Sequence, residues 1–373
     1  MLRVFATAIL LAAPIGAQAA CEPGEVKATM SVVTALQGHP KGEAALALAE
    51  RVNTQLNGRM CMEVFGRAEL FDDDEALVAL LDGRLQLAAP SLSKFEQYTK
   101  AFRLFDLPFL FDGPVEVMNF QNSPTGQQML SVLDPSGLTA MGFWTNGMKQ
   151  MSANRPLVMP GDAEGLTFRI QPSDVIEAQF DALGAETKRL AFSKVYEALV
   201  SGEVQGQENT WSNIYGNKFY QAQDGITATN HGYLGYLVVT SGAFLESLDP
   251  VLRDEFLLLF ELTSHEYNGF AYETNEARAL DVWRRTQKVV ELSDDQVAAW
   301  REAFAPVYEI FGPEIGFDLI AEAQRFNASA PVEFGDAPPR GTAIVRRGPI
   351  VTRNETGGDG AQPATGRILQ VSP

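Results

Sequence analysis

An alternation of strands and helices between residues 165 and 209 constrains the fold more than any other part of the chain. The segment reads GLTFRIQPSDVIEAQFDALGAETKRLAFSKVYEALVSGEVQGQEN. We expect a strand, a helix, a second strand, a second helix and a closing polar loop. Strands that alternate with helices imply a parallel sheet, and ligands bind at the carboxyl ends of such strands. The segment therefore predicts an α/β fold with a ligand site.

Two polar residues of this segment are candidates for that site. Arg169 lies on the first strand, which is otherwise apolar, and Asn209 lies in the closing loop. A buried guanidinium costs free energy unless it has a partner, and a carboxylate that accepts two parallel hydrogen bonds is the usual one. That carboxylate can belong to a ligand or to an Asp or Glu of the chain. The residues alone leave both interpretations open.

The region before residue 90 shows the same alternation. Apolar periodicity predicts strands at 26–34, 60–65 and 85–90, with helices at 42–56 and 72–81. This βαβαβ order predicts a first lobe with right-handed crossovers, and the segment 165–209 predicts a second lobe. Three long helices are expected nearer the carboxyl end, at 242–258, 262–286 and 293–326.

The first twenty residues have the pattern of an export signal. Arg3 precedes a short apolar run over residues 4–15, and an A-x-A site follows at 17–19. This pattern predicts a signal peptide over residues 1–20, cleaved after Ala19 or Ala20, and a soluble periplasmic product. A lipid anchor on Cys21 and a buried first helix are the two alternatives.

The chain has only two cysteines, Cys21 and Cys61. Export to an oxidising compartment allows a disulfide between them, two separate thiols are the alternative, and the sequence leaves both open. Their spacing excludes a CxxC redox or metal motif.

The charge balance excludes one class of partner. The formal net charge is −18, from 29 basic and 47 acidic residues, whereas nucleic-acid binding needs a positive face. An anionic ligand remains compatible, because a buried site can be locally positive in a negative protein. The tail over residues 335–373 is rich in Gly, Pro and Thr and is expected to be disordered. Its five arginines have two interpretations. They are solvated, or they contact acidic lipid or a partner.

No catalytic pattern is present in the sequence. The three histidines form no HExxH motif, and there is no GxSxG, phosphate loop or dinucleotide-binding glycine signature. We therefore expect a binding protein that is not an enzyme and that holds no metal or cofactor.

Several short motifs occur in a fixed order along residues 25–330. They are HPKG at 39–42, AAPSLSKF at 88–95, FDLPFLF at 105–111, WTNGMKQMSAN at 144–154, GLTFRI at 165–170, FSKVYEAL at 192–199, GQEN at 206–209 and TNHGYLGYLVV at 229–239. In this order they resemble the substrate-binding proteins of tripartite ATP-independent periplasmic (TRAP) transporters, the DctP family of C4-dicarboxylate type.

The resemblance implies a two-lobed, periplasmic-binding-protein-like α/β fold, with a ligand cleft between the lobes and a long bracing C-terminal helix. The chain is expected to cross between the lobes more than once. The expected divisions are a signal peptide, 1–20; lobe I, 21–146 and 235–274; lobe II, 147–234 and 275–302; a C-terminal helical region that braces both lobes, 303–334; and the tail, 335–373.

The resemblance also implies roles for individual residues. Arg169 matches the arginine that clamps the ligand carboxylate, Asn209 should hydrogen-bond the same carboxylate, and Phe192 should pack near them, with core packing as its alternative. Lys149 stands where many members have arginine and could meet a second carboxylate. Further candidates for the cleft are Trp144, Asn146 and Asn213, with Ser91 and Lys94, and also Ser93, His39 and Lys41, on the first-lobe side.

The expected function is capture of a small organic acid outside the cytoplasm and its delivery to the membrane subunits of a TRAP transporter. A C4-dicarboxylate such as malate, succinate or fumarate is the expected ligand. We expect a monomer without nucleic acid and without direct membrane insertion. The alternative is a ligand-sensing binding protein for a membrane signalling partner. Neighbouring genes for permease subunits would favour transport, and a neighbouring kinase gene would favour sensing.

Overall fold

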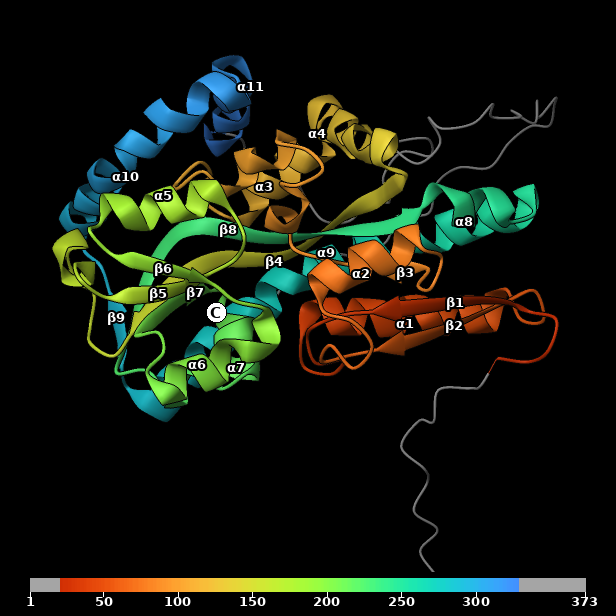
Figure 1. Cartoon of the computed structure of the whole chain (residues 1–373), viewed down its shortest axis with the longest axis horizontal. Coiled ribbons are helices and arrows are strands. Elements are labelled where there is room, and N and C mark those ends of the chain that lie inside the picture. Colours follow the sequence, from red (N-terminus) through yellow and green to blue (C-terminus); the bar gives the residue numbers. More distant parts are fainter. Residues whose placement is uncertain (1–20, 329–373) are drawn as a thin grey trace, which may run out of the picture.

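One continuous sheet of nine strands runs through both lobes of the computed structural model, which describes residues 21–328 (Figure 1). The signal peptide expected over 1–20 and the tail expected over 335–373 lie outside the described residues. The strand order is β2-β1-β3-β8-β4-β7-β5-β6, and β9 pairs with β8. The strands are β1 Val26–Ser31, β2 Met60–Phe65, β3 Leu87–Ala88, β4 Leu138–Ala153, β5 Thr167–Ile170, β6 Glu186–Arg189, β7 Gly206–Asn209, β8 Gly225–Ser241 and β9 Val289–Glu291.

The two ends of this sheet are the parallel units that the sequence predicts. β1 pairs in parallel with β2 and β3, and β5 pairs in parallel with β6 and β7. We call the first unit, with α1 and α2, the N-terminal lobe, and the second, with α5 to α7, the C-terminal lobe. The two-lobed α/β fold is therefore confirmed.

Two long antiparallel strands, which the sequence did not predict, join the lobes. β4 and β8 pair along their length, and this ladder shifts register at three places, one of them between Thr145 and Gly147. β8 reaches β3 at one end and β9 at the other, while β4 pairs with β7. Register shifts of this kind bend strands, so the connection between the lobes is curved.

Helices cover both faces of the sheet (Figure 1). The α-helices are α1 Pro40–Gln55, α2 Asp73–Leu81, α3 Pro114–Asn122, α4 Pro124–Met129, α5 Asp174–Ala182, α6 Val195–Ser201, α7 Trp211–Gly216, α8 Gly242–Ser247, α9 Pro250–Thr286, α10 Asp294–Ile315 and α11 Phe317–Gln324. Short 3₁₀ turns occur at Leu92–Phe95, Ala101–Asp106, Leu130–Ser136, Pro160–Ala163, Phe192–Lys194, Phe219–Gln221 and Arg325–Ala328.

The helix α9 braces the two lobes over its 37 residues. Phe256 and Phe260 pack in the core of the N-terminal lobe, and Val282 packs in a core of the C-terminal lobe. Asp249 caps its first turn, and Pro250 occupies a position where a missing N–H costs nothing. The expected break between 258 and 262 is wrong, because this stretch has no capping or helix-breaking residue, and burial of Leu259 and Phe260 holds the helix together.

A second bracing helix, α10, follows near the carboxyl end. Trp300 and Phe304 pack with β5 and α5 residues of the C-terminal lobe. One turn further, Val307 and Phe311 join the largest core, which includes residues of α2 and of the 3₁₀ turns after β3. The single helix expected over 293–326 is two helices, because Gly316 adopts a left-handed φ of 99° between them.

Cys21 and Cys61 form a disulfide, with their Cα atoms 5.4 Å apart. It ties the first described residue to β2, at the edge of the sheet. The bond closes a loop with a sequence separation of 40 residues, for which chain entropy gives a stabilisation of about 3–4 kcal/mol. No helix within residues 21–328 is long and apolar enough to cross a membrane.

Candidate ligand-binding cleft

A small pocket lies between the two lobes and draws its walls from both. From the N-terminal lobe come Val33, Thr34, Lys41, Asp73, Ser91 and Lys94; from the C-terminal lobe come Arg169, Gln171, Phe192, Asn209 and Asn213; from β8 come Leu234 and Tyr236. Its volume is about 20 Å³, which is room for roughly one water molecule. The lobes must therefore separate before a small organic molecule can enter.

Arg169 lies near the carboxyl end of β5, in the C-terminal lobe, and is 2% exposed. Its Nε and Nη2 groups donate hydrogen bonds to the carbonyl oxygen of Leu190, at 3.0 and 2.8 Å. These bonds orient the guanidinium, and Arg169 forms no ion pair with any residue between 21 and 328. Burial lowers its pKa to about 10. A buried cation held in place beside a pocket, without a carboxylate partner among the described residues, is suited to an anionic ligand.

Asn209 and Asn213 form a polar pair on the same side. Asn213 Nδ2 donates to Asn209 Oδ1 at 2.6 Å, and Asn213 Oδ1 contacts His39 Nε2 at 2.9 Å. The second contact links the C-terminal lobe to the turn before α1 in the N-terminal lobe. Asn209 stands at the end of β7, so the polar loop expected there is a strand whose backbone pairs with β4 and β5.

Cations from the N-terminal lobe face Arg169 across the pocket. Lys41 donates from Nζ to the carbonyl oxygen of Ala89 at 3.0 Å, and its ammonium lies 3.9 Å from the ring centroid of Tyr236. Lys94 Nζ lies 2.5 Å from Asp74 Oδ2. Both lysines are buried. Burial lowers the pKa of Lys41 to about 8.

Two further polar groups on the N-terminal side have unusual surroundings. Burial raises the pKa of Asp73, against the pull of Lys41 and Lys94. The Oγ1 atom of Thr34 is buried and has no hydrogen-bond partner in the described part of the chain. Buried hydroxyl groups are almost always paired, so an unpaired one that lines a cleft indicates a missing partner there. Ser91 accepts a hydrogen bond from Gln171 across the cleft at 2.6 Å.

Aromatic rings complete the walls. Phe192 lines the pocket and meets Phe219 edge-on, with ring centroids 5.9 Å apart. Tyr236 is held by a 2.7 Å hydrogen bond from Asn146 Nδ2 to its hydroxyl, and Ser212 donates to Asn146 Oδ1 at 2.6 Å. Asn146 thus lies behind Tyr236 and does not itself line the pocket.

The remaining two sequence candidates lie away from the pocket. Trp144 is packed in the core of the N-terminal lobe, stacked on Phe260, and its indole N–H donates to Ser264 Oγ at 2.8 Å. Lys149 is buried in a separate polar cluster, where its Nζ lies 2.9 Å from Glu208 Oε1. Of the nine candidates, six line the pocket: Ser91, Lys94, Arg169, Phe192, Asn209 and Asn213.

The cluster around Glu208 is fully buried beneath the cleft. Its second carboxylate oxygen lies 3.1 Å from His231 Nε2, and His231 Nδ1 contacts the Thr229 hydroxyl at 2.7 Å. Burial alone would raise the pKa of Glu208, but Lys149 and His231 outweigh it and hold this pKa at about 2. Because Glu208 precedes Asn209 on β7, the cluster anchors the strand end that presents Asn209 to the pocket.

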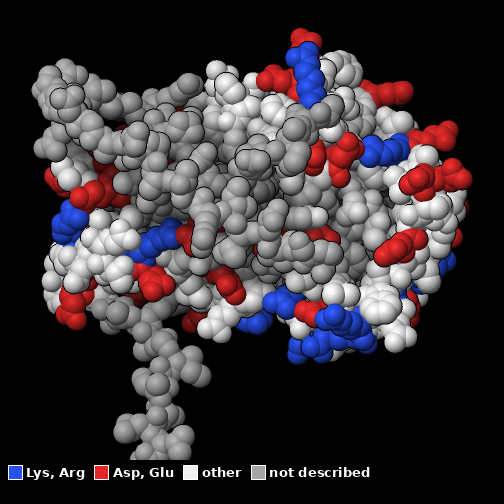
Figure 2. All heavy atoms as spheres, turned by 180° about the vertical axis from the view of Figure 1, so that it is seen from behind, with Lys and Arg blue, Asp and Glu red and all other residues white. Residues whose placement is uncertain are grey.

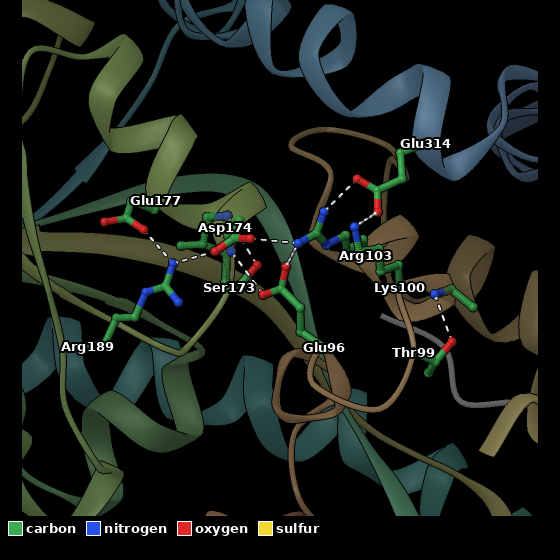
Figure 3. Close-up of polar contacts among 11 residues, drawn as sticks. Glu96, Thr99, Lys100, Arg103, Ser173, Asp174, Glu177, Arg189 and Glu314 are labelled. Atoms are coloured by element: carbon green, nitrogen blue, oxygen red, sulfur yellow. Dashed lines mark hydrogen bonds and ion pairs between the residues drawn. The ribbon is translucent and has the colours of Figure 1, made fainter. Parts of the chain in front are cut away.

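A second ion-pair network joins the lobes outside the pocket (Figure 3). Arg103, 7% exposed, pairs with Glu96 of its own segment, with Asp174 at the start of α5 at 2.7 Å, and with Glu314 of α10 at 2.8 Å. Arg189 of β6 also pairs with Asp174, at 2.6 Å. Since Arg103 contacts both lobes and the bracing helix, the network holds the lobes in the arrangement described here.

Seven of the residues that line the pocket were secondary candidates or were not predicted from the sequence, and three of these carry a charge or an aromatic ring. Lys41 was a secondary candidate of the HPKG motif, and Tyr236 lies within the TNHGYLGYLVV motif without having been singled out. Asp73 follows an N-capping aspartate and reads as part of an acidic first helical turn. No local signal marks it, because only the packing of α2 against β3 and β8 brings it to the cleft.

Comparisons with known proteins add an independent result. The family model described as "Bacterial extracellular solute-binding protein, family 7" (DctP) matches residues 31–313. The "C4-dicarboxylate-binding periplasmic protein DctP" of Vibrio cholerae is 44% identical over 326 residues, which is 87% of this chain and 98% of that protein.

Solved structures show the same similarity. A TRAP periplasmic solute-binding protein from Shewanella oneidensis, with bound succinate, has a TM-score of 0.80 and 40% identity, covering 81% of this chain and 99% of that one. Another, from Pseudomonas aeruginosa PAO1 with bound L-malate, has a TM-score of 0.75 and 38% identity, covering 76% and 99%.

Proposed function

The chain belongs to the bacterial extracellular solute-binding proteins of family 7, which serve TRAP transporters and are not enzymes. We propose that its cleft binds a C4-dicarboxylate such as succinate, malate or fumarate. In this family, small carboxylates are the ligands, and the TRAP membrane subunits are the partners that receive them. The observation that carries the proposal is the cation on each side of the pocket, Arg169 from one lobe and Lys41 from the other.

The separated cations suit a ligand with two anionic ends. One carboxylate would accept hydrogen bonds from the remaining N–H groups of Arg169 and from Asn209 Nδ2, which donates to no group in the described part of the chain. The other would meet Lys41, Lys94 and the Thr34 hydroxyl. The named ligands of the Shewanella and Pseudomonas proteins, succinate and L-malate, have this form.

Closure of the lobes would strengthen these interactions. A ligand that bridges both lobes replaces water in the pocket, and charge-assisted hydrogen bonds gain strength as the effective dielectric falls. The contacts between Ser91 and Gln171 and between His39 and Asn213 already connect the lobes beside the pocket. Lys149, Trp144 and Asn146 act in this scheme as supports, because none of them lines the pocket.

A thermal-shift screen of small organic acids tests the proposal. At one hundred times its dissociation constant, a ligand selective for the folded state stabilises it by about 2.7 kcal/mol, which raises the midpoint by roughly 5 °C for a chain of this size. We expect C4-dicarboxylates to give this shift, and monocarboxylates such as butyrate to give a smaller one. The proposed ligand class would be rejected if only sugar acids raised the midpoint, or if none of the acids raised it.

The pH dependence of binding tests the role of Lys41. Its pKa is lowered to about 8, Asp73 is the carboxyl that faces it, and the neighbouring His39 is neutral because burial lowers its pKa to about 3. A bound carboxylate favours the charged ammonium, so binding takes up a proton once the pH exceeds the pKa of Lys41 in the free protein. Calorimetry should show affinity falling as pH rises from 8 to 9.5, by up to about tenfold per unit.

The matched control is Lys41→Met, which removes the titrating group while keeping a similar volume. It should bind more weakly at pH 7 and show little change between pH 8 and 9.5. If the wild-type protein keeps the same affinity across this range, Lys41 does not contact the ligand.

We propose further that the protein is exported and works as a monomer in the periplasm. Proteins of the DctP family are periplasmic, and the proposed signal sequence precedes Cys21. We also propose that it binds neither nucleic acid nor the membrane directly, in keeping with its net charge of −18. Light scattering on the purified protein would disprove the monomer if it gave twice the chain mass.

Intact-mass measurement tests the processing and the disulfide together. The exported protein should begin at Ala20 or Cys21, and treatment with an alkylating reagent without reduction should add no mass. Retention of Met1 would contradict export by cleavage. Modification of two thiols would show that Cys21 and Cys61 are not joined in solution.

A further inference from the structure

A second cavity of about 640 Å³ lies between α9, β9 and the loop that precedes α3. It shares no lining residue with the ligand cleft. We call it the α9 groove. Three large apolar side chains of α9 line it and stay exposed: Trp283 at 52%, Leu280 at 47% and Tyr272 at 40%. A cluster of exposed large apolar groups in a groove is typical of an interaction site.

The charge of the α9 groove is negative. Asp112, Glu276 and Glu291 line it, and no lysine or arginine is among its described lining residues. Asp112 pairs with Arg301 at 3.3 Å, whereas Glu276 and Glu291 form no ion pair within residues 21–328. Burial raises the pKa of Glu276. A cation placed beside Glu276 would therefore offset part of its desolvation cost.

The described part of the chain ends beside this groove. The last 3₁₀ turn is Arg325–Ala328, and Asn327 donates from Nδ2 to the carbonyl oxygen of Leu110 at 2.9 Å. Asn327 Oδ1 accepts a hydrogen bond from the backbone N–H of Asp112 at 3.2 Å. Because Asp112 is itself a lining residue, the following segment begins next to the groove.

That segment contains the most basic stretch of the chain. Residues 338–353 read PPRGTAIVRRGPIVTR, with four arginines, no acidic residue and the aliphatic pairs Ile344-Val345 and Ile350-Val351. The whole chain has a net charge of −18, and carboxylate side chains are spread over the described part of the rear face (Figure 2). The stretch thus has the two properties, positive charge and apolar side chains, that complement the α9 groove.

We propose that residues 338–353 of the same chain occupy the α9 groove. The linker of residues 329–337 spans up to about 30 Å when extended, which is ample from Asp112. A short tether holds the segment at a local concentration in the millimolar range, so individually weak contacts suffice. Arginines pair with Glu276 and Glu291 and stack on Trp283, and the aliphatic pairs cover Leu280 and Tyr272.

Hydrogen exchange on the full mature protein tests this assignment. In the variant Arg346→Ser/Arg347→Ser/Arg353→Ser, loss of three weak ion pairs should speed amide exchange in the second half of α9 and in β9 by roughly fivefold. Arg367→Ser, which lies in the tail beyond the basic stretch, is the matched control and should exchange like wild type. Equal exchange in the triple variant and in wild type would overturn the proposal.

Charge reversal distinguishes the possible occupants. Glu276→Lys/Glu291→Lys should give the same faster exchange, and adding Arg346→Glu/Arg347→Glu/Arg353→Glu should restore protection. Failure of this restoration would exclude the tail as the occupant. Protection that appears only as protein concentration rises would assign the groove to a second copy of the chain and likewise overturn the proposal.

Discussion

Replacing Arg169 with alanine should weaken binding of the organic acid on the order of 30-fold or more. The change removes a guanidinium that is 2% exposed and already oriented by the carbonyl of Leu190. A ligand carboxylate would then lie poorly paired in a closing cleft, and such losses run to about 2–5 kcal/mol. Calorimetry with the best acid from the thermal-shift screen measures the effect.

Arg169→Lys should also bind more weakly, since an ammonium cannot donate to Leu190 and to a carboxylate with the same fork. Arg284→Ala is the matched control, because Arg284 is an exposed arginine at the end of α9 and should leave affinity unchanged. Circular dichroism must show that Arg169→Ala folds. Wild-type affinity in that variant would place the carboxylate contact elsewhere, and unfolding would assign Arg169 a structural role instead.

The largest loss of stability is expected from the buried pair Lys149–Glu208. Glu208→Gln leaves the Lys149 ammonium buried without its carboxylate, and breaking one side of a buried pair costs about 3–5 kcal/mol. Denaturant unfolding should show this loss. The double variant Lys149→Met/Glu208→Gln should recover a large part of it, because neither position then carries a buried charge.

An exposed pair provides the control for this experiment. Lys188 and Glu203 lie 3.5 Å apart with nearly half of each side chain exposed. Lys188→Met should therefore cost less than about 1 kcal/mol. A double variant at 149 and 208 that is no more stable than Glu208→Gln would show that the loss comes from disrupted packing and not from an unpaired charge.

The same pair predicts the direction of acid sensitivity. The pKa of Glu208 is about 2 in the folded protein and near 4.5 in the unfolded chain. A depressed carboxyl pKa contributes stability above the unfolded value, and that contribution is lost as pH falls through the folded value. Wild type should thus lose stability between about pH 4.5 and 2 more steeply than the double variant.

Local sequence patterns were sufficient to predict the parallel units of the sheet and part of the residues that line the cleft. Short apolar runs predicted β1, β2 and β5, since the apolar side chains of a buried strand are visible in the sequence, and the strand–helix alternation predicted β6. The position of Arg169 on an apolar strand, followed by the GQEN motif, predicted two residues that line the pocket. These features depend on neighbours close in sequence.

The remaining cleft residues and the join between the lobes were decided by tertiary structure, because they depend on contacts between distant segments. Lys149 and Trp144 look like cleft residues in the motif WTNGMKQMSAN, yet β4 turns the first toward Glu208 and the second toward Ser264 of α9. Asp73 reaches the pocket only through the packing of α2. Likewise, the register of β4 against β8 sets where the lobes bend. The pairings of Lys149 and Trp144 join residues that lie 59 and 120 positions apart, and no local pattern records them.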